Sequence, residues 1–245
     1  MNYLVEVKML KKSYGSKEAV NGISFNIEED QILGLLGPNG SGKTTTIGIL
    51  LGLLKPSAGE IKINKMNFEN NRIDILSKIN FISPYIELPK KLTVKQNLTV
   101  YGKLYNIKNL KERIEYLTEK LRLEKLLNRI TGELSSGQKN RASLAKALIN
   151  KPKVLFLDEP TASLDPEIGD FVRSFLETYK KENKISILLA SHNMNEVTRL
   201  CKSILMMKDG VIIDKGSPNE LITKHGRKNL EEVFLKLSRN NNEPY

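Results

Sequence analysis

Cysteine is almost absent from this 245-residue chain, because Cys201 is its single example. An internal disulfide is therefore impossible, and such sparse cysteine is typical of a reducing compartment. No apolar run approaches the ~20 residues that a membrane-spanning helix needs. Residues 1–15 also lack the apolar core of a secretory signal. We therefore expect a soluble, cytoplasmic chain that would need a partner to act at a membrane.

Acidic residues are outnumbered: 28 Asp and Glu stand against 39 Lys and Arg, which gives a formal net charge of +11. This excess is compatible with nucleic acid, with an anionic membrane surface, or with a plain solvated surface. No dense block of Lys and Arg indicates a nucleic-acid arm. The length suits one large domain or one domain with an insertion, and it is enough for a sizeable core.

The most specific motif is the run 37–44, which reads GPNGSGKT. It follows the apolar run 32–36 and precedes the apolar-periodic segment 44–54, so the local order is strand, glycine-rich turn and helix. The spacing G-x-x-x-x-G-K-[ST] is that of the Walker A phosphate loop. The sequence therefore predicts a nucleotide site here.

Each residue type in this loop suits a triphosphate. Glycine allows backbone angles that a Cβ forbids, and it lets the chain approach a phosphate closely. Backbone N–H groups and the following helix N-terminus favour negative charge. Lys43 brings a point charge towards the β- and γ-phosphates, and Thr44 a hydroxyl for Mg²⁺. The predicted ATP-binding residues are Tyr14, Gly37, Pro38, Asn39, Gly40, Ser41, Gly42, Lys43, Thr44 and Thr45.

Two alternating segments precede the phosphate loop. Residues 4–10 place Val5, Val7 and Met9 on one face, and residues 23–27 alternate apolar and polar side chains. We expect these two strands to form a small antiparallel sheet beside the nucleotide. Tyr14 lies in the turn after the first strand, where it could stack on an adenine face. Plain turn packing of Tyr14 is the alternative interpretation.

The middle of the chain changes to a helical pattern. Short strands are expected at 60–63 and 79–82 with a helix at 72–78 between them, and longer helices at 93–105 and 110–127. The apolar stripes of these longer helices indicate core packing. We therefore expect an all-helical insertion at 93–130 within an otherwise α/β pattern. A short helix and a disordered tail are expected over 226–245, where Asn240–Asn242 is the least ordered part.

A serine-glycine turn stands at residues 134–138, before another helical pattern. Ser135 is a good N-cap, and Gly137 allows close approach of another group. Taken alone, the turn only starts a helix. Taken with the phosphate loop upstream, it is a second helix end that could bind phosphate.

The continuous apolar run 154–157 predicts a strand buried on both faces, and it leads into Asp158 and Glu159. A carboxylate at the end of such a strand lies at the phosphate edge of the sheet. Asp158 is therefore the candidate Mg²⁺ ligand. Glu159 is expected to face away from Asp158, towards a water in line with the γ-phosphate, and is the candidate general base.

A further buried strand at 185–190 ends at Ser191 and His192. A lone histidine is usually structural, but His192 is expected at the same sheet edge as the other candidates. It could bond the γ-phosphate or position the attacking water. His225 has no such context, and we expect it on the surface. Between the two strands, Pro166 is expected to start a helix.

This ordered set of motifs resembles the nucleotide-binding domain of ABC transporters over about residues 4–225. The resemblance implies an ATPase domain over residues 1–225, with a P-loop NTPase core, a mostly parallel sheet, an N-terminal antiparallel β-subdomain and a helical subdomain inserted at about 84–146. It implies two such domains meeting head to tail, each ATP lying between one phosphate loop and the other domain's signature. The catalytic set is then Lys43, Glu159 and His192, the signature acting in trans is Ser135, Ser136, Gly137 and Gln138, and the D-loop is Ser163, Leu164 and Asp165.

Two positions depart from the family pattern. Pro84 stands where the family has a glutamine that touches Mg²⁺ or water, in a loop that senses ATP and contacts the membrane partner. Our hypothesis is that the Ser83 hydroxyl, or a water, replaces it. Ser136 stands where glycine is commonest in the signature, which is a mild change because Ser135 and Gly137 remain.

The resemblance implies an ATP-binding and ATP-hydrolysing subunit that drives transport through a separate membrane-spanning permease at the cytoplasmic face of the membrane. The segment 229–235 resembles the short end of exporter subunits of the drug, lipid and polysaccharide type. A homodimer or a heterodimer is expected, and no nucleic-acid partner. Two alternatives remain: a soluble ABC-type ATPase acting on nucleic acid or ribosomes, and a weakly hydrolysing regulatory subunit.

Overall fold

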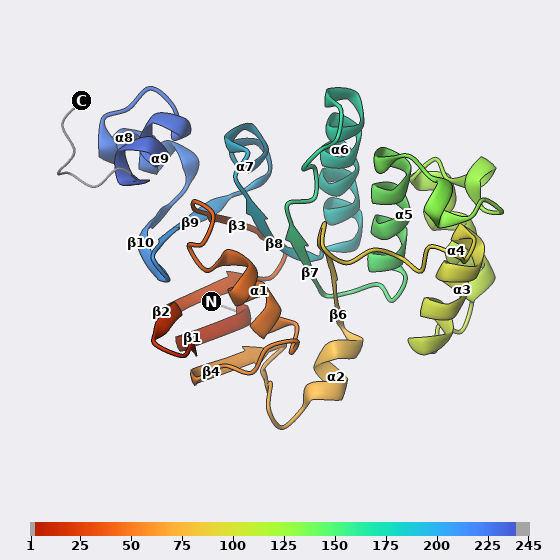
Figure 1. Ribbon diagram of the computed structural model, residues 1–245, viewed down its shortest axis with the longest axis horizontal. Helices are drawn as coiled ribbons and strands as arrows, with labels where there is room; N and C mark the ends of the chain where they lie inside the picture. Colours follow the sequence, from red (N-terminus) through yellow and green to blue (C-terminus); the bar gives the residue numbers. More distant parts are fainter. Residues whose placement is uncertain (1–2, 239–245) are drawn as a thin grey trace. The chain divides into compact units, whose positions relative to one another are not determined.

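The structure is a computed structural model that describes residues 3–238. The chain folds as two compact units. One contains the residues up to Ile75 and those from Ser186 onwards, and the other is Leu76–Ile185. In Figure 1 the second unit runs from the lower end of the yellow segment to the teal helix. The predicted tail at 240–242 lies outside the described residues.

An antiparallel sheet in the first unit has the order β2-β1-β4-β5. Its strands are β1 (Tyr3–Tyr14), β2 (Lys17–Glu28), β4 (Ala58–Ile63) and β5 (Met66–Asn67). This confirms the small antiparallel sheet that the alternating residues predicted. The hairpin between the two long strands closes where Tyr14 pairs with Lys17.

The predicted face of the first strand is wrong at Met9. A register shift between Val7 and Leu10 inserts a bulge, and Met9 takes the left-handed φ of 48°. Its N–H then donates to the Ser24 hydroxyl at 2.8 Å instead of continuing the ladder. Met9 is therefore 59% exposed while Leu10 is fully buried. An extra residue in one strand moves every later side chain to the opposite face.

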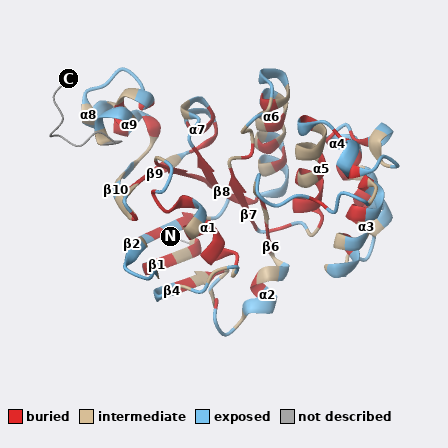
Figure 2. Cartoon of the chain, in the orientation of Figure 1, coloured by how far each residue is buried: buried red, intermediate tan, exposed pale blue. Residues whose placement is uncertain are grey.

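A second, mainly parallel sheet in the first unit has β3 (Ile32–Leu36) at its centre. Parallel neighbours flank it: β8 (Ser186–Ser191) on one side and β9 (Ser203–Lys208) on the other. The last strand, β10 (Val211–Gly216), pairs antiparallel with β9. Every residue of β3 and β8 is buried, as expected of parallel strands covered on both faces. Figure 2 shows them as continuous red ribbons.

Within residues 3–238, the first unit also contains the helices α1 (Lys43–Leu50), α7 (Met194–Leu200), α8 (Pro218–His225) and α9 (Leu230–Ser238). The segment predicted as a helix to residue 54 is shorter, because Gly52 takes a left-handed φ of 66°. Among residues 3–238, no helix is both long and apolar enough to cross a lipid bilayer.

The expectation of a surface position for His225 is wrong. Its Nε2 lies 2.6 Å from a carboxylate oxygen of Asp214, and the His225 side chain is 13% exposed. The Lys224 ammonium donates to the other oxygen of Asp214, also at 2.6 Å. Burial alone would raise the pKa of Asp214, but the hydrogen bonds from Lys224 and His225 hold it below its ordinary value. These contacts fasten α8 to β10.

In the second unit β6 (Ile79–Ile82) and β7 (Val154–Asp158) pair in parallel. Two helices start where the sequence predicted: α5 (Ser136–Leu148) after the expected cap Ser135, and α6 (Pro166–Asn183) at the expected proline. Proline suits the first turn of α6, because its missing N–H would lack an intrahelical partner there. The short helix α2 (Arg72–Ser77) runs from the first unit into the second.

Two helices of the insertion, α3 (Val94–Leu104) and α4 (Leu110–Lys120), pack on each other and on α5. The prediction of a helix as far as residue 127 is wrong. Arg122 takes a φ of 53°, which ends α4, and a 3₁₀ turn (Glu124–Leu126) follows. A second 3₁₀ turn, Thr131–Glu133, precedes α5.

Arg113 fixes α4 to the end of α5. Its guanidinium is buried, and it donates to the carbonyl oxygens of Leu148 at 2.5 Å and of Ile149 at 3.4 Å. It also donates to the Tyr179 hydroxyl at 2.7 Å. Helix carbonyls at a C-terminus carry partial negative charge, so a cation stabilises them even when buried.

Candidate functional site

The phosphate loop connects β3 to α1 in the first unit. Lys43 is the first residue of α1, and its side chain folds back over the loop. The ammonium donates to the carbonyl oxygens of Gly37 at 2.7 Å and of Pro38 at 3.0 Å. Lys43 is only 7% exposed, so its charge is held inside the curve of the loop.

The loop leaves no room for side chains at its close points. A Cβ on Gly37 would lie 2.4 Å from the Met207 carbonyl oxygen and 2.5 Å from the Ser41 hydroxyl. Gly42 has a φ of 102°, and its Cβ would lie 2.4 Å from the Ala19 carbonyl oxygen. The Ser41 hydroxyl is buried and has no hydrogen-bond partner among the described residues. A backbone cradle, a buried cation and an unsatisfied hydroxyl fit a bound phosphate.

The remaining predicted ATP-binding residues lie at the rim of the first unit. Asn39, Gly40 and Thr44 are exposed, and Thr45 is partly exposed in the first turn of α1. Tyr14 ends β1 and is 49% exposed, with the Lys12 ammonium 5.0 Å from its ring centroid. Adenine stacking by Tyr14 therefore stays a prediction.

Hydrogen bonds made by Ser191 and Asn193 fix the backbone on either side of His192. The buried Ser191 hydroxyl donates to the Glu196 carboxylate at 2.6 Å. Asn193 caps α7 by accepting from the Glu196 N–H at 3.2 Å. His192 is exposed between these two anchored residues. Sequence reasoning missed Glu196, which is 1% exposed and lies four residues after His192.

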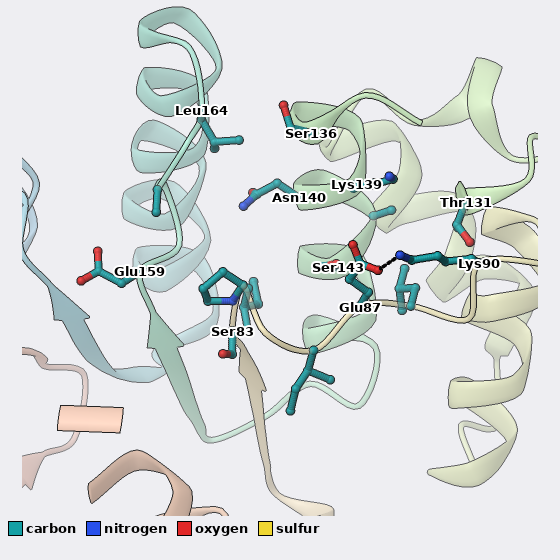
Figure 3. Close-up of a pocket in the computed structure, with 16 residues that line it drawn as sticks. Ser83, Glu87, Lys90, Thr131, Ser136, Lys139, Asn140, Ser143, Glu159 and Leu164 are labelled. Carbon is teal, nitrogen blue, oxygen red and sulfur yellow. Dashed lines mark ion pairs between the residues drawn. The ribbon is translucent and has the colours of Figure 1, made fainter. Parts of the chain in front are cut away.

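The end of β7 presents two carboxylates in the second unit. Asp158 is the last strand residue and is 2% exposed. Glu159 follows with a φ of 52°, a left-handed conformation that costs a non-glycine residue about 1 kcal/mol. This turn ends the strand abruptly and brings Glu159 to the wall of a cavity (Figure 3).

Ser135 caps α5 in the way that the sequence predicted. Its hydroxyl accepts from the Gln138 N–H at 3.3 Å, and the Gln138 side chain accepts from the Ser135 N–H at 3.1 Å. This reciprocal capping box fixes the start of the helix. Gly137 is buried, and a Cβ there would lie 3.1 Å from Ile168. Ser136 is exposed, so the departure at that position leaves the cap intact.

The D-loop residues lead into α6. Ser163 takes a left-handed φ of 61°, and Leu164 is partly exposed. The Asp165 carboxylate accepts from the Ile168 N–H at 2.9 Å and so caps the helix. Capping accounts for the identity of Asp165 without a role in catalysis.

A cavity of about 200 Å³ gathers several of these residues in the second unit (Figure 3). Glu159, Leu164 and Ser136 line it together with Ser83 and Asn140, the last of which sequence reasoning missed. Asn140 donates to the Pro160 carbonyl oxygen at 2.7 Å, while its own buried carbonyl oxygen has no partner among the described residues. A polar ligand or a water would satisfy that oxygen.

The loop after β6 forms another wall of this cavity. Pro84 is exposed, and the Ser83 hydroxyl accepts from the Tyr85 N–H at 3.4 Å. Tyr85 and Ile86 are 79% and 48% exposed, so apolar surface projects from the loop. Glu87 and Lys90 form an ion pair of 2.5 Å at its far end.

A buried lysine, also missed from the sequence, lies behind this loop. The Lys146 ammonium donates to the Phe81 carbonyl oxygen at 3.2 Å, and the Phe81 and Tyr101 ring centroids lie 4.6 Å and 5.5 Å away. Burial lowers the pKa of Lys146 from its ordinary 10.5 to about 8. Its position at 146, on the apolar side of a helical pattern, was the available signal.

Phosphate loop, strand-end carboxylates and serine-capped helix together define a P-loop ATPase of the cassette type. The ABC transporter family model matches residues 20–162. This chain therefore belongs to the ABC transporter family, as an ATP-binding and ATP-hydrolysing subunit.

Named relatives support this placement. The chain is 36% identical to the Nod factor export ATP-binding protein I of Paraburkholderia xenovorans, over 94% of this chain and 76% of that protein. It is 35% identical to a bacitracin transport ATP-binding protein of Bacillus licheniformis, over 94% and 75%.

Solved structures agree with the fold. An ATP-binding subunit of an ABC transporter superposes with a TM-score of 0.88 at 26% identity, covering 96% of this chain and all of that one. A dimeric cassette in a post-hydrolysis state bound to ADP and phosphate superposes with a TM-score of 0.80 at 26% identity, covering 87% and 98%. The expected α/β cassette fold is thereby confirmed.

Proposed function

We propose that this chain binds MgATP and hydrolyses it to drive export through a separate membrane-spanning permease. The observation that carries the proposal is the Lys43 ammonium held inside a loop that excludes any Cβ at Gly37 and Gly42. A preorganised cation and backbone dipoles stabilise phosphate charge without reorganisation during the reaction. We also propose residues 1–225 as the ATPase domain, with residues 84–146 as its helical subdomain.

In this proposal each candidate residue has its own role towards the nucleotide. Thr44 and Asp158 would hold Mg²⁺, and the metal would supply positive charge to the phosphate oxygens. Glu159 accepts a proton from the attacking water, and His192 donates a hydrogen bond to the γ-phosphate. Phosphoryl transfer needs little covalent help, so positioning and charge stabilisation do most of the catalysis.

The second half of each site comes from another chain. Ser135 and Gly137 lie at a helix N-terminus, which favours negative charge. In the dimer this helix end binds the ATP held by the partner's phosphate loop, and the partner's signature binds the ATP held by this chain. Closure of the dimer on ATP and its release after hydrolysis is the work-producing step. The partner chain is a second copy or a related cassette.

The permease docks on the loop 83–92 and the adjoining helical subdomain. Exposed Tyr85 and Ile86 on that loop supply apolar contacts beside the cavity. A relative named for Nod factor export supports an export direction. Docking places the chain at the cytoplasmic face of the membrane, and the permease selects the cargo.

The test compares purified wild type with Glu159→Gln and Lys43→Ala. Glu159→Gln keeps ATP binding, lowers turnover by 10²-fold or more through loss of the base, and traps an ATP-dependent dimer. Lys43→Ala loses ATP binding itself. Phosphate release measures turnover, a nucleotide-binding assay measures ATP affinity, and gel filtration detects the dimer. Turnover near wild type in Glu159→Gln removes that residue as base.

Pro84 supports a second candidate, a regulatory subunit that binds ATP but hydrolyses it weakly. Proline has no side-chain oxygen to offer Mg²⁺ or water at that place in the loop. A low wild-type rate that rises on Pro84→Gln favours this second function. Unchanged Mg²⁺ dependence in Ser83→Ala removes the Ser83 hydroxyl as a substitute.

A further inference from the structure

Residues 90–111 contain no acidic side chain. Glu87 precedes this run and Glu112 follows it, and six lysines lie within it. We call it the lysine segment; it contains α3 and the turns on either side. Its lysines are Lys90, Lys91, Lys95, Lys103, Lys108 and Lys111.

The outward face of α3 combines charge with apolar surface. Lys95 and Lys103 are exposed and lie about 80° apart around the helix at 100° per residue. Val100 and Leu104 continue the same exposed arc and are 46% and 73% exposed. The opposite face, including Leu98, is buried against α4 and α5. Figure 2 shows the contrast between the two faces of α3.

Five of the six ammonium groups are available for an external anion. Lys90 is paired with Glu87 at 2.5 Å. Within the described residues, the other five lysines of the segment have no acidic group at salt-bridge distance, and all five are exposed. Unpaired surface cations next to exposed aliphatic side chains form the surface that an anionic bilayer attracts.

We propose that the lysine segment binds anionic phospholipid headgroups directly, with Val100 and Leu104 entering the headgroup layer. Each lysine near an anionic membrane surface contributes a gain of about fivefold in affinity, and aliphatic side chains add burial that depends on headgroup depth. We assign the exposed face of α3, with Lys95, Lys103, Val100 and Leu104, to lipid, and the loop 83–92 with the part of the subdomain next to it to the permease. The lipid contact itself needs neither nucleotide nor permease. It draws on the proposed function only for bringing the chain beside a membrane.

The composition of the face favours lipid over nucleic acid. The segment has no arginine, the residue that binds phosphate bidentately. Tyr101 is turned inwards against Lys146, so it gives no stacking platform for bases. Val100 and Leu104 would find no partner on a phosphate backbone, whereas a bilayer interface accepts them.

Vesicle flotation with the purified full chain tests the proposal. Phosphatidylcholine vesicles are compared with vesicles holding about 30% phosphatidylglycerol, at low and high salt. Lys95→Gln, Lys103→Gln and Lys108→Gln are combined in one variant. The matched control combines Lys8→Gln, Lys17→Gln and Lys65→Gln, three exposed lysines of the first unit that change the net charge equally. Circular dichroism and ATPase rate confirm the fold of both variants.

Wild type and the control are expected to bind the anionic vesicles, more weakly at high salt, and not the neutral ones. The lysine variant of the segment is expected to bind anionic vesicles about 100-fold more weakly. The double variant Val100→Ser, Leu104→Ser is expected to bind more weakly at high salt, where burial of aliphatic side chains contributes most of the affinity. Equal loss in both lysine variants overturns the proposal, because net charge alone then explains binding. So does tighter binding to a 30-nucleotide RNA through the same lysines, or vesicle binding that survives in the segment variant.

Lys43→Ala separates this proposal from the proposed function. It abolishes ATP binding but is expected to leave vesicle binding unchanged, because the lysine segment lies in the other unit. If the wild type hydrolyses ATP but does not bind anionic vesicles, the lipid contact is refuted and the proposed function stands. If the wild type binds these vesicles but does not bind ATP, the proposed function is refuted and the lipid contact stands.

Discussion

Lys146 gives the most quantitative prediction. Its ammonium is buried against Phe81 and Tyr101, and it donates to the Phe81 carbonyl oxygen, its one hydrogen-bond partner among the described residues. Burial disfavours the charged form, so its pKa falls from 10.5 to about 8 in the folded chain. The unfolded chain keeps the ordinary value and therefore binds more protons between pH 8 and 10.5.

The sign and the size follow from linkage. A state that binds more protons is favoured at low pH, so the unfolding free energy of the wild type rises with pH over this window. For a folded pKa of about 8, the Lys146 contribution to the unfolding free energy rises by roughly 2 to 3 kcal/mol between pH 7 and pH 10. Lys146→Met removes the titrating group and with it this rise.

The assay is urea unfolding of wild type and Lys146→Met at pH 7 and pH 10. Circular dichroism follows the helices, because the chain has no tryptophan to report by fluorescence. Other lysines and tyrosines titrate equally in both proteins, so they cancel in the difference. Lys153→Met, at an exposed position, is the control and should show no such change.

If the unfolding free energies of wild type and Lys146→Met changed by the same amount between pH 7 and pH 10, the reasoning would be refuted. It would mean that the ammonium reaches water, or that the two aromatic rings and the Phe81 carbonyl oxygen fully offset its burial. A fall in wild-type stability relative to Lys146→Met would reverse the sign and place a stabilising charge where we infer a penalty.

Three further predictions concern the two units separately. Gly37→Ala should lose ATP binding at least tenfold in a nucleotide-binding assay, because its Cβ would meet the Met207 carbonyl oxygen at 2.4 Å; unchanged ATP binding in this variant would contradict the steric argument. Ser135→Ala should lower the unfolding free energy by about 1 kcal/mol in urea through loss of the cap, and Ser135→Asp should restore it; equal stability of all three proteins contradicts the capping role. Asp214→Asn should cost about 1 to 2 kcal/mol at pH 7 by removing charged hydrogen bonds. Because the folded pKa of Asp214 lies below its ordinary 3.8, that contribution is present above pH 3.8 and disappears as pH falls through the folded value; an unchanged acid transition in the variant would contradict it.

Local chemistry explains what could be predicted from the sequence. The phosphate loop and the Ser135 cap are short, contiguous patterns whose geometry follows from a few neighbouring residues. The buried strands β3 and β7 were equally readable, because continuous apolar runs between turns have few other structures.

The misses depend on contacts that are distant in sequence or on single backbone angles. Met9 leaves its expected face because of one bulge, and α4 ends early because Arg122 adopts a left-handed φ. Neither residue type demands that conformation. His225 pairs with Asp214 from another element, and Glu196 is buried by a hydrogen bond to Ser191. Such partners become visible only when the chain is folded.

The reciprocal cap at the start of α5 does not use the hydroxyl hydrogen of Ser135. A hydroxyl has one hydrogen and two lone pairs, and in the cap the Ser135 oxygen only accepts a hydrogen bond, from the Gln138 N–H. Its hydrogen can therefore turn to an incoming oxyanion while the helix end stays intact. Assembly and separation of two subunits then need not remake this helix, so the contact can form and break each cycle with little rearrangement.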